Sequence, residues 1–327
     1  LGLVGGAMLV REIGRRAEEH GLRVHYPLLG AAGYAGLSVW HGGLSGSAPL
    51  LIATPGHFLE NEMGVVTLGR TLGSAQNLVT CVLLVAVMAI LFAAFHPRGE
   101  ECEAPDLPPE SIPDDASEES ATIISKIENA KLLGWLAGGV GLLALAQVQW
   151  ERGPHLDLNT MNFALFFVGI ALHGSARAFL SSASEGIRTT TGIVLQFPFY
   201  AGIMGVMKGA GLSSLFSTWM AGAASAKTLP LFVFVSAGLV NLFIPSGGGQ
   251  WGVQGPIVVE AARSLGVPLE KVVMAVAYGD QWTNLVQPFW ALPLLGVTGL
   301  KAGQIMGYAF GALICTGVVY AGTLLIF

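Results

Sequence analysis

A stretch of 32 residues, from Thr228 to Val259, contains no Asp, Glu, Lys or Arg. Both of its ends are apolar and typical of membrane helices, which need about 20 such residues to span a bilayer. Its middle, "IPSGGGQWGVQGP" (Ile244 to Pro256), holds three consecutive glycines and two prolines, which interrupt helices. In hydrocarbon, non-helical backbone is tolerated only where it is buried in protein or lines a polar cavity. The fold must therefore enclose this interruption.

The composition indicates a polytopic membrane protein. The chain is 53% hydrophobic and 11% charged, against about 25% charged residues in soluble domains. Three scattered cysteines form neither a disulfide framework nor a metal motif. The net charge of −5 arises largely from one loop, and no nucleic-acid partner is expected. The first residues, "LGLVGGAMLV", resemble the end of a membrane segment, so we expect the chain to lack an N-terminal part.

Eight apolar segments alternate with polar loops. The region 96–131 holds ten of the 21 acids and five prolines, which predicts a solvated linker. Four arginines between Arg11 and Arg23 place their loop on the cytoplasmic side. The predicted spans are listed here in chain order: Tyr26–His57, Leu72–Phe95, Leu132–Trp150, Leu156–His173, Thr189–Met207, Thr228–Val259, Val272–Leu300 and Ala302–Phe327.

An internal repeat relates the two ends of the chain. Ala31–Thr54 aligns without gaps with Ala275–Thr298, with six of 24 positions identical. Interrupted segments at matching positions of two halves are typical of transporters built on inverted repeats. We expect 1–95 to be the C-terminal part of a first repeat, consisting of a hairpin arm, a broken helix and a last helix. The second repeat, 132–327, is expected to contain three helices, a re-entrant hairpin at 228–262, a broken helix at 270–300 and a last helix at 302–327.

Three interruptions are predicted from these patterns. We expect Pro245–Gln250 to be the hairpin tip, and Trp40–Ser47 and Gly279–Pro288 to be the breaks in the two crossing helices. Glycine allows the backbone to turn there and to approach a ligand closely.

The same residues resemble the bacterial short-chain fatty acid transporter family. The resemblance is carried by "PSGGGQWGVQGP" (245–256), "AYGDQWTNLVQPFWALP" (277–293), "LQFPFYAGI" (195–203) and "GGLSGSAPLLIATPG" (42–56). It implies uptake of acetoacetate, butyrate and similar monocarboxylates across the bacterial cytoplasmic membrane. It also implies a relation to the ion-transporter clan, whose members pair two hairpins with two broken helices and move carboxylates with Na⁺ or H⁺.

Asp280 is the single charged residue between Lys271 and Lys301. A carboxylate at membrane depth is costly and should face a cavity or a partner. We expect it to couple a cation to transport, with N-capping of a half-helix near Gln281 as the structural alternative. His41 is a second candidate for ion coupling, as a proton shuttle, although a buried histidine with satisfied hydrogen bonds is the commoner case.

The remaining candidates are polar residues and glycines in the three interruptions. Backbone N–H groups at a half-helix start favour an anion, so the expected ligands of the substrate carboxylate lie there. Thr283 joins the ion-coupling set, and a Na⁺ would lie near Ser246, Thr283 and Asn284. The predicted substrate-binding residues are Ser246, Gly247, Gly248, Gly249, Gln250, Asn284, Gln287, Gly43, Ser45 and Ser47.

Other classes of function fit less well. A hydrolase would need a nucleophile beside a base, and the glycines at 247, 249 and 252 lack the strand that a dinucleotide fingerprint requires. No cofactor is expected beyond Na⁺ or H⁺ as coupling ion. A Na⁺/H⁺ exchanger or a dicarboxylate transporter of the same clan remains an alternative. The expected partners are the carboxylate, the bilayer and a second copy in a homodimer.

Overall fold

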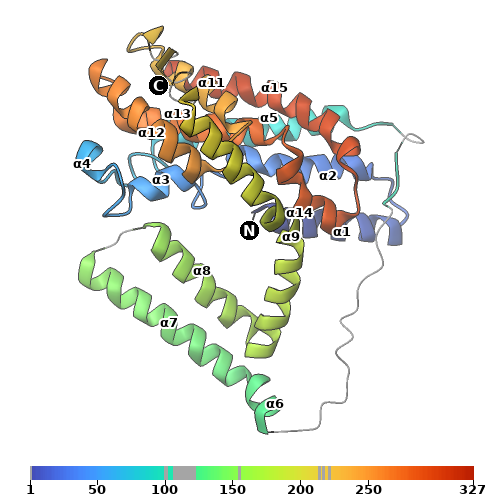
Figure 1. The fold of residues 1–327 in the computed structure, drawn as a ribbon. Coiled ribbons are helices and arrows are strands. Elements are labelled where there is room, and N and C mark those ends of the chain that lie inside the picture. The colour runs from blue at the N-terminus through green and yellow to red at the C-terminus, as the bar shows by residue number, and fades with distance from the viewer. Residues whose placement is uncertain are drawn as a thin grey trace. The chain divides into compact units, whose positions relative to one another are not determined.

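The computed structural model describes residues 2–98, 102–105, 123–153, 156–212, 215, 218–219 and 222–327. Every regular element among them is helical (Figure 1). Three helices are long and apolar enough to cross a membrane: α5 (Ala75–Phe95), α7 (Lys131–Arg152) and α15 (Ala302–Ile326). A fourth candidate is α8 (Leu158–His173) together with the start of α9 (Ala176–Gly209), a pair bent by 120°. The prediction of an all-helical chain with helices suited to a membrane is confirmed for the described residues.

The chain forms two compact units, Leu1–Leu107 with Gly192–Phe327, and Pro108–Thr191. The second unit contains α6 (Ile123–Glu128), α7, α8 and the first part of α9. Its α7 packs on α8 through glycines, since a Cβ at Gly138 would lie 2.7 Å from that of Ala171. Small residues at such contacts let membrane helices approach closely. Within the predicted linker 96–131, residues 123–128 are helical, and 99–101 and 106–122 lie outside the described residues.

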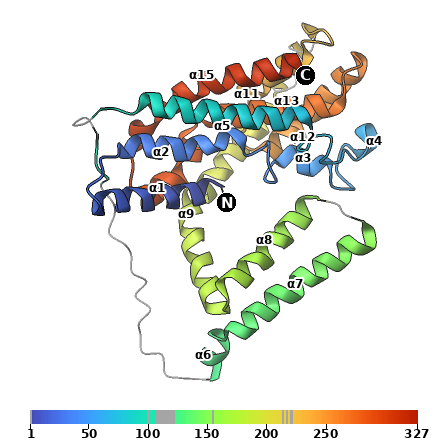
Figure 2. The ribbon, with the colours of Figure 1, turned by 180° about the vertical axis from the view of Figure 1, so that it is seen from behind.

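The first unit combines elements from both ends of the chain. In Figures 1 and 2, α2, α5 and α15 lie side by side. In addition, α1 packs on α14 and α12 packs on α3, so helices from the N-terminal part of the chain contact helices from the C-terminal part. The remaining bounds in this unit are α1 (Gly2–Glu19), α2 (Tyr26–Ala35), η1 (Gly36–Val39), α3 (Ser47–Ile52), α4 (Glu60–Met63), α11 (Leu229–Asn241), α12 (Gly247–Ser264), α13 (Leu269–Asn284) and α14 (Pro288–Thr298).

The most enclosed helix is α13, which is buried at nearly every position from Val272 to Asn284. It crosses α11 at two glycines. A Cβ at Gly279 would lie 2.6 Å from that of Ala237, and one at Gly238 would lie 2.9 Å from the ring of Trp282. Glycine at both positions allows the two backbones to meet, and this contact holds the polar end of α13 against the end of α11.

The three interruptions differ in detail from the predicted ones. The first break, Trp40–Gly46, lies where it was predicted, and α3 begins at Ser47. The hairpin tip is Leu242–Ser246, not Pro245–Gln250, because Ser246 caps α12 by accepting a hydrogen bond from the Gly249 amide at 3.3 Å. The predicted break Gly279–Pro288 is too long, since α13 stays helical through Asn284 and the break is Leu285–Gln287.

The second break ends at a proline, and a tyrosine from another helix donates a hydrogen bond to its carbonyls. Pro288 begins α14, where its missing N–H costs nothing, and it keeps the preceding residue extended. Two carbonyls at this break accept backbone amides, Asn284 from Gln287 and Gln287 from Trp290, each at 3.1 Å, and both also accept from one side chain. The hydroxyl of Tyr34, from α2, donates to the carbonyl oxygens of Asn284 (2.5 Å) and Gln287 (2.8 Å).

A short segment, 102–105, binds the start of α2. The Glu103 amide donates to Nδ1 of His25 at 3.0 Å, and Nε2 of His25 lies 3.0 Å from the hydroxyl of Tyr308. With Nδ1 accepting, Nε2 carries the proton and donates to Tyr308. Burial lowers the pKa of His25 below its ordinary value of 6.5, which outweighs the opposite effect of the Glu103 charge.

Candidate functional site

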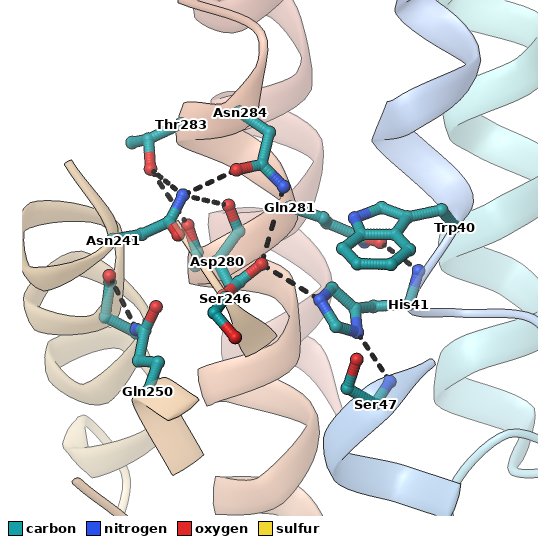
Figure 3. Close-up of polar contacts among 12 residues, drawn as sticks. Trp40, His41, Ser47, Asn241, Ser246, Gln250, Asp280, Gln281, Thr283 and Asn284 are labelled. Atoms are coloured by element: carbon teal, nitrogen blue, oxygen red, sulfur yellow. Dashed lines mark hydrogen bonds and ion pairs between the residues drawn. The ribbon is translucent and has the colours of Figure 1, made fainter. Parts of the chain in front are cut away.

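A histidine from the first break pairs with an aspartate of α13 (Figure 3). Nε2 of His41 lies 2.9 Å from Oδ1 of Asp280, and both residues are almost completely buried. The backbone amide of His41 donates to Oε1 of Gln281 at 2.7 Å, which fixes the break against the same helix. Two of the three predicted ion-coupling residues, His41 and Asp280, lie 239 positions apart in sequence and are in direct contact.

A backbone hydrogen bond determines the protonation of His41. Its Nδ1 accepts from the Ser47 amide at 3.1 Å, at the first residue of α3. A proton on Nδ1 would face the N–H of Ser47, and two donors cannot form a hydrogen bond. Nδ1 is therefore unprotonated, and Nε2 carries the ring proton and donates a hydrogen bond to Asp280. His41 is therefore neutral in this arrangement, and it leaves the charge of the Asp280 carboxylate uncompensated.

Asp280 is not a helix cap. Four further residues of α13 follow it, and the N-cap of α14 is Gln287. This excludes the capping role that the sequence left open. Among the described residues, His41 is the one ion-pair partner of Asp280, and Oδ2 of the carboxylate is buried without a hydrogen-bond partner. A buried charge in this state carries a penalty that a bound cation or proton would remove.

Asn241, the last residue of α11, connects the hairpin to α13 and was missed by the sequence analysis. Its Nδ2 lies within 3.0 Å of the Asp280 carbonyl oxygen, Oγ1 of Thr283 and Oδ1 of Asn284. The signal available was one amide at the end of an apolar run, directly before the tip. A buried amide there needs partners, and the facing helix provides them.

In three buried side-chain amides of the described part of the chain, the nitrogen is hydrogen-bonded and the oxygen is not. Nε2 of Gln287 donates to the Asn241 carbonyl (2.7 Å), Nε2 of Gln250 donates to the Ala237 carbonyl (2.8 Å), and Asn241 donates as described. Each nitrogen is fixed by a backbone carbonyl, which accepts and cannot donate. Within the described residues, Oδ1 of Asn241, Oε1 of Gln250 and Oε1 of Gln287 have no partner, as is true of Oδ2 of Asp280. The unpaired groups thus include one carboxylate oxygen and three amide oxygens, the atom type that hard cations prefer.

The glycines of α12 bring the hairpin to the histidine. A Cβ at Gly247 would lie 2.7 Å from Nε2 of His41, whereas one at Gly248 would meet nothing within 4 Å. Ser246 is half-buried and its hydroxyl is used as the helix cap. The start of α12 therefore contacts the His41–Asp280 pair through Gly247.

The other predicted residues divide into two groups. Asn284 lies at the pair, with its Nδ2 3.4 Å from Oδ1 of Asp280, whereas Thr283 donates to the Gly238 carbonyl at 3.0 Å and accepts from Asn241. Ser45 is exposed and donates to the Trp40 carbonyl, so its hydroxyl stabilises the turn. Gly43 also belongs to this turn, where its carbonyl accepts from the Gly46 amide at 2.9 Å.

Tyrosines at the border of the site were not among the predicted residues. Nε2 of Gln281 donates to the hydroxyl of Tyr320 at 3.0 Å, and that hydroxyl donates to the Ser38 carbonyl. The hydroxyl of Tyr278 donates to Oδ1 of Asn77 at 3.0 Å. These bonds connect α13 to α15, η1 and α5, and they hold the helix that carries Asp280.

Known proteins resemble this chain over its whole length. Residues 1–327 match the family described as "Short chain fatty acid transporter". A protein of Escherichia coli (strain K12) named "Putative short-chain fatty acid transporter" is 39% identical over 331 residues, covering 100% of this chain and 74% of that protein. A Haemophilus influenzae protein of the same name is 37% identical over 329 residues, covering 98% and 73%. No solved structure matches. The chain belongs to the short-chain fatty acid transporter family, and a transporter rather than an enzyme is what the sequence predicted.

Proposed function

We propose that this protein takes up short-chain monocarboxylates, such as butyrate and acetoacetate, by symport with a cation across the bacterial cytoplasmic membrane. The family and the names of the relatives support the substrate class. Coupling to a cation rests on one observation, the buried Asp280 carboxylate whose neighbour His41 is neutral.

The coupling cation binds at Asp280 in this proposal. Either Na⁺ or a proton at Oδ2 would remove the uncompensated charge. Na⁺ would use oxygen ligands, and the unpaired oxygens of Asn241, Gln250 and Gln287 are available for this. Thr283 and Asn284 complete the ion-coupling set, together with Ser246 at the hairpin. A proton would need Asp280 alone and one acceptor.

The substrate carboxylate lies near the start of α12 and the two breaks. Gly247, Gly248, Gly249 and the Ser246 cap present the positive end of the helix dipole, which contributes about 0.3–1 kcal/mol to binding of an anion. Because this is modest, the side-chain amides of Gln250, Asn284 and Gln287 supplement it in this proposal, for which their nitrogens leave the acceptors that they have in the present arrangement. Ser47 and the turn with Gly43 and Ser45 contribute from the first break.

The architecture proposed for transport is an inverted repeat, with 1–95 and 132–327 as its parts and 96–131 as the connection. In this proposal α1 corresponds to α12, the elements from α2 to α3 correspond to α13 and α14, and α5 corresponds to α15. The packing of α1 on α14 and of α12 on α3 supports it, because each hairpin arm then contacts the broken helix of the other half.

Uptake of labelled butyrate by the full-length protein in proteoliposomes tests the proposal. Imposed Na⁺ and H⁺ gradients, applied separately, identify the coupling ion, and succinate tests the dicarboxylate alternative. Cation exchange without carboxylate uptake would favour an exchanger. The proposal is wrong if no monocarboxylate from acetate to hexanoate enters in a gradient-dependent manner.

A further inference from the structure

Two tryptophans at the breaks hold buried indole N–H groups without acceptors. Among the described residues, Nε1 of Trp40 and Nε1 of Trp290 have no hydrogen-bond partner and are shielded from solvent. Nε1 of Trp282, by contrast, donates to the Leu313 carbonyl at 2.7 Å. A buried N–H without an acceptor is unfavourable, so two at one place require an explanation.

The two indoles come from different breaks and contact each other. Trp40 follows η1 at the start of the first break, and Trp290 lies in the first turn of α14, just after the second. Their ring centroids are 5.7 Å apart at an angle of 51°. The ring of Trp40 also lies on that of His41, with centroids 3.9 Å apart, and its nitrogen-bearing edge is turned toward α13 in Figure 3.

A carboxylate would complement this pair. It brings acceptor oxygens for both N–H groups, and the flat apolar rings suit a short alkyl chain. No Lys or Arg occurs in either break, so the donors carry no formal charge. Neutral donors fit a monocarboxylate that travels with its own cation, because the pair of substrate and cation is then electrically neutral.

We propose that Trp40 and Trp290 donate their indole hydrogens to the carboxylate of the substrate and enclose its alkyl chain. This deepens the proposed function and rests on it for the substrate class. Both nitrogens are covered in the present arrangement, so the substrate reaches them when α14 separates from the first break. The two indoles then act as specificity-determining residues contributed by the two halves.

The test replaces each indole by a ring without a donor. Trp40→Phe and Trp290→Phe in the full-length protein each remove one hydrogen bond to a carboxylate. A loss of about 1.5–3 kcal/mol corresponds to roughly 10- to 150-fold weaker binding of butyrate. Butyrate binding to the solubilised protein is followed by isothermal titration calorimetry, and KM is measured in proteoliposomes. In the protein without substrate, neither substitution removes a hydrogen bond, because the two indole N–H groups have no acceptor among the described residues. The melting temperature should therefore show no decrease from a lost hydrogen bond.

Trp251→Phe is the matched control. Among the described residues, Nε1 of Trp251 is likewise buried and without a partner, but its ring lies in the apolar cluster that also contains Phe234 and Val272. This variant should keep the butyrate Kd and KM of the wild type even if its melting temperature falls. Unchanged Kd and KM in both Trp40→Phe and Trp290→Phe, with an active wild type, would overturn the proposal. Butyrate binding that depends on the two indoles, without gradient-driven uptake, would refute symport and uphold the indole site.

Discussion

Asp280→Asn separates the coupling role of this residue from a structural one. The carboxylate accepts from Nε2 of His41 at 2.9 Å, and Asn retains an acceptor oxygen at the same place. A hydrogen bond to a charged group contributes about 1.5–3 kcal/mol and a neutral one about 0.5–1.5, so the exchange costs about 1 kcal/mol. Removing an uncompensated buried charge offsets this cost. The melting temperature should therefore stay the same or rise.

The effect on the coupling cation is much larger. A unit charge about 4 Å from a carboxylate gains about 4 kcal/mol at an effective dielectric constant of about 20. Since every 1.4 kcal/mol is a factor of ten, loss of the charge weakens cation binding by roughly 100- to 1,000-fold. Uptake at ordinary cation concentrations should collapse, or lose its dependence on the cation, while the protein remains folded.

Two measurements on the same preparation decide the outcome. Uptake of labelled butyrate in proteoliposomes is followed over a range of Na⁺ concentrations and pH values, and unfolding of the solubilised protein is followed by fluorescence. Glu260→Gln is the control, because Glu260 is an exposed carboxylate on α12. Normal uptake by Asp280→Asn with unchanged cation dependence would refute the reasoning, and coupling would then have to rest on neutral ligands such as Ser246, Thr283 and Asn284.

Three further predictions concern the surroundings of the site. Gly247→Ala should lower the free energy of unfolding by about 1–3 kcal/mol because the new methyl overlaps His41, whereas Gly248→Ala, with open space, should not lower it; equal denaturation midpoints would contradict this. Tyr34→Phe removes the hydroxyl that two carbonyls at the second break share, while their backbone amide donors remain, and should cost about 0.5–1.5 kcal/mol in the same assay; an unchanged midpoint would be evidence against that role. Folding lowers the pKa of His25, so the unfolded chain binds more protons just below pH 6.5, and the free energy of unfolding decreases as the pH is lowered through that range. An NMR titration of His25, assigned with His25→Ala, should give a midpoint below 6.5, and a higher midpoint would refute this prediction.

The helices and their interruptions could be predicted because they depend on local sequence. Glycine and proline within apolar runs marked all three interruptions, and the first was predicted to within one residue, since Ser47 begins α3 instead of ending the break. The boundaries of the other two were wrong for identifiable reasons. Ser246 is a favourable N-cap, which makes Gly247–Gln250 the first turn of a helix. The five residues from Asp280 to Asn284 stay helical because Asn241 and Tyr34 supply partners from other helices.

The candidate site could be predicted in composition but not in its contacts. Asp280 stood out as one charge in an apolar segment, and His41 as a histidine in a break. Their contact depends on packing between segments 239 positions apart, which no local pattern encodes. The same limit explains why Asn241 was missed. Its importance lies in three partners on α13, and an isolated amide in an apolar run does not reveal which helix it will face.

The contacts of His41 explain how an ion at Asp280 would affect the hairpin. One ring nitrogen binds Asp280, the other holds the first amide of α3, and Gly247 of α12 packs against the same ring. A cation that draws the carboxylate away alters the partner of Nε2, whereas a proton at Oδ2 leaves Oδ1 as its acceptor. Because Nδ1 remains tied to Ser47, the ring cannot rotate to compensate without breaking that bond. The change must therefore be taken up by α3 or by the start of α12, the two elements that meet at this histidine.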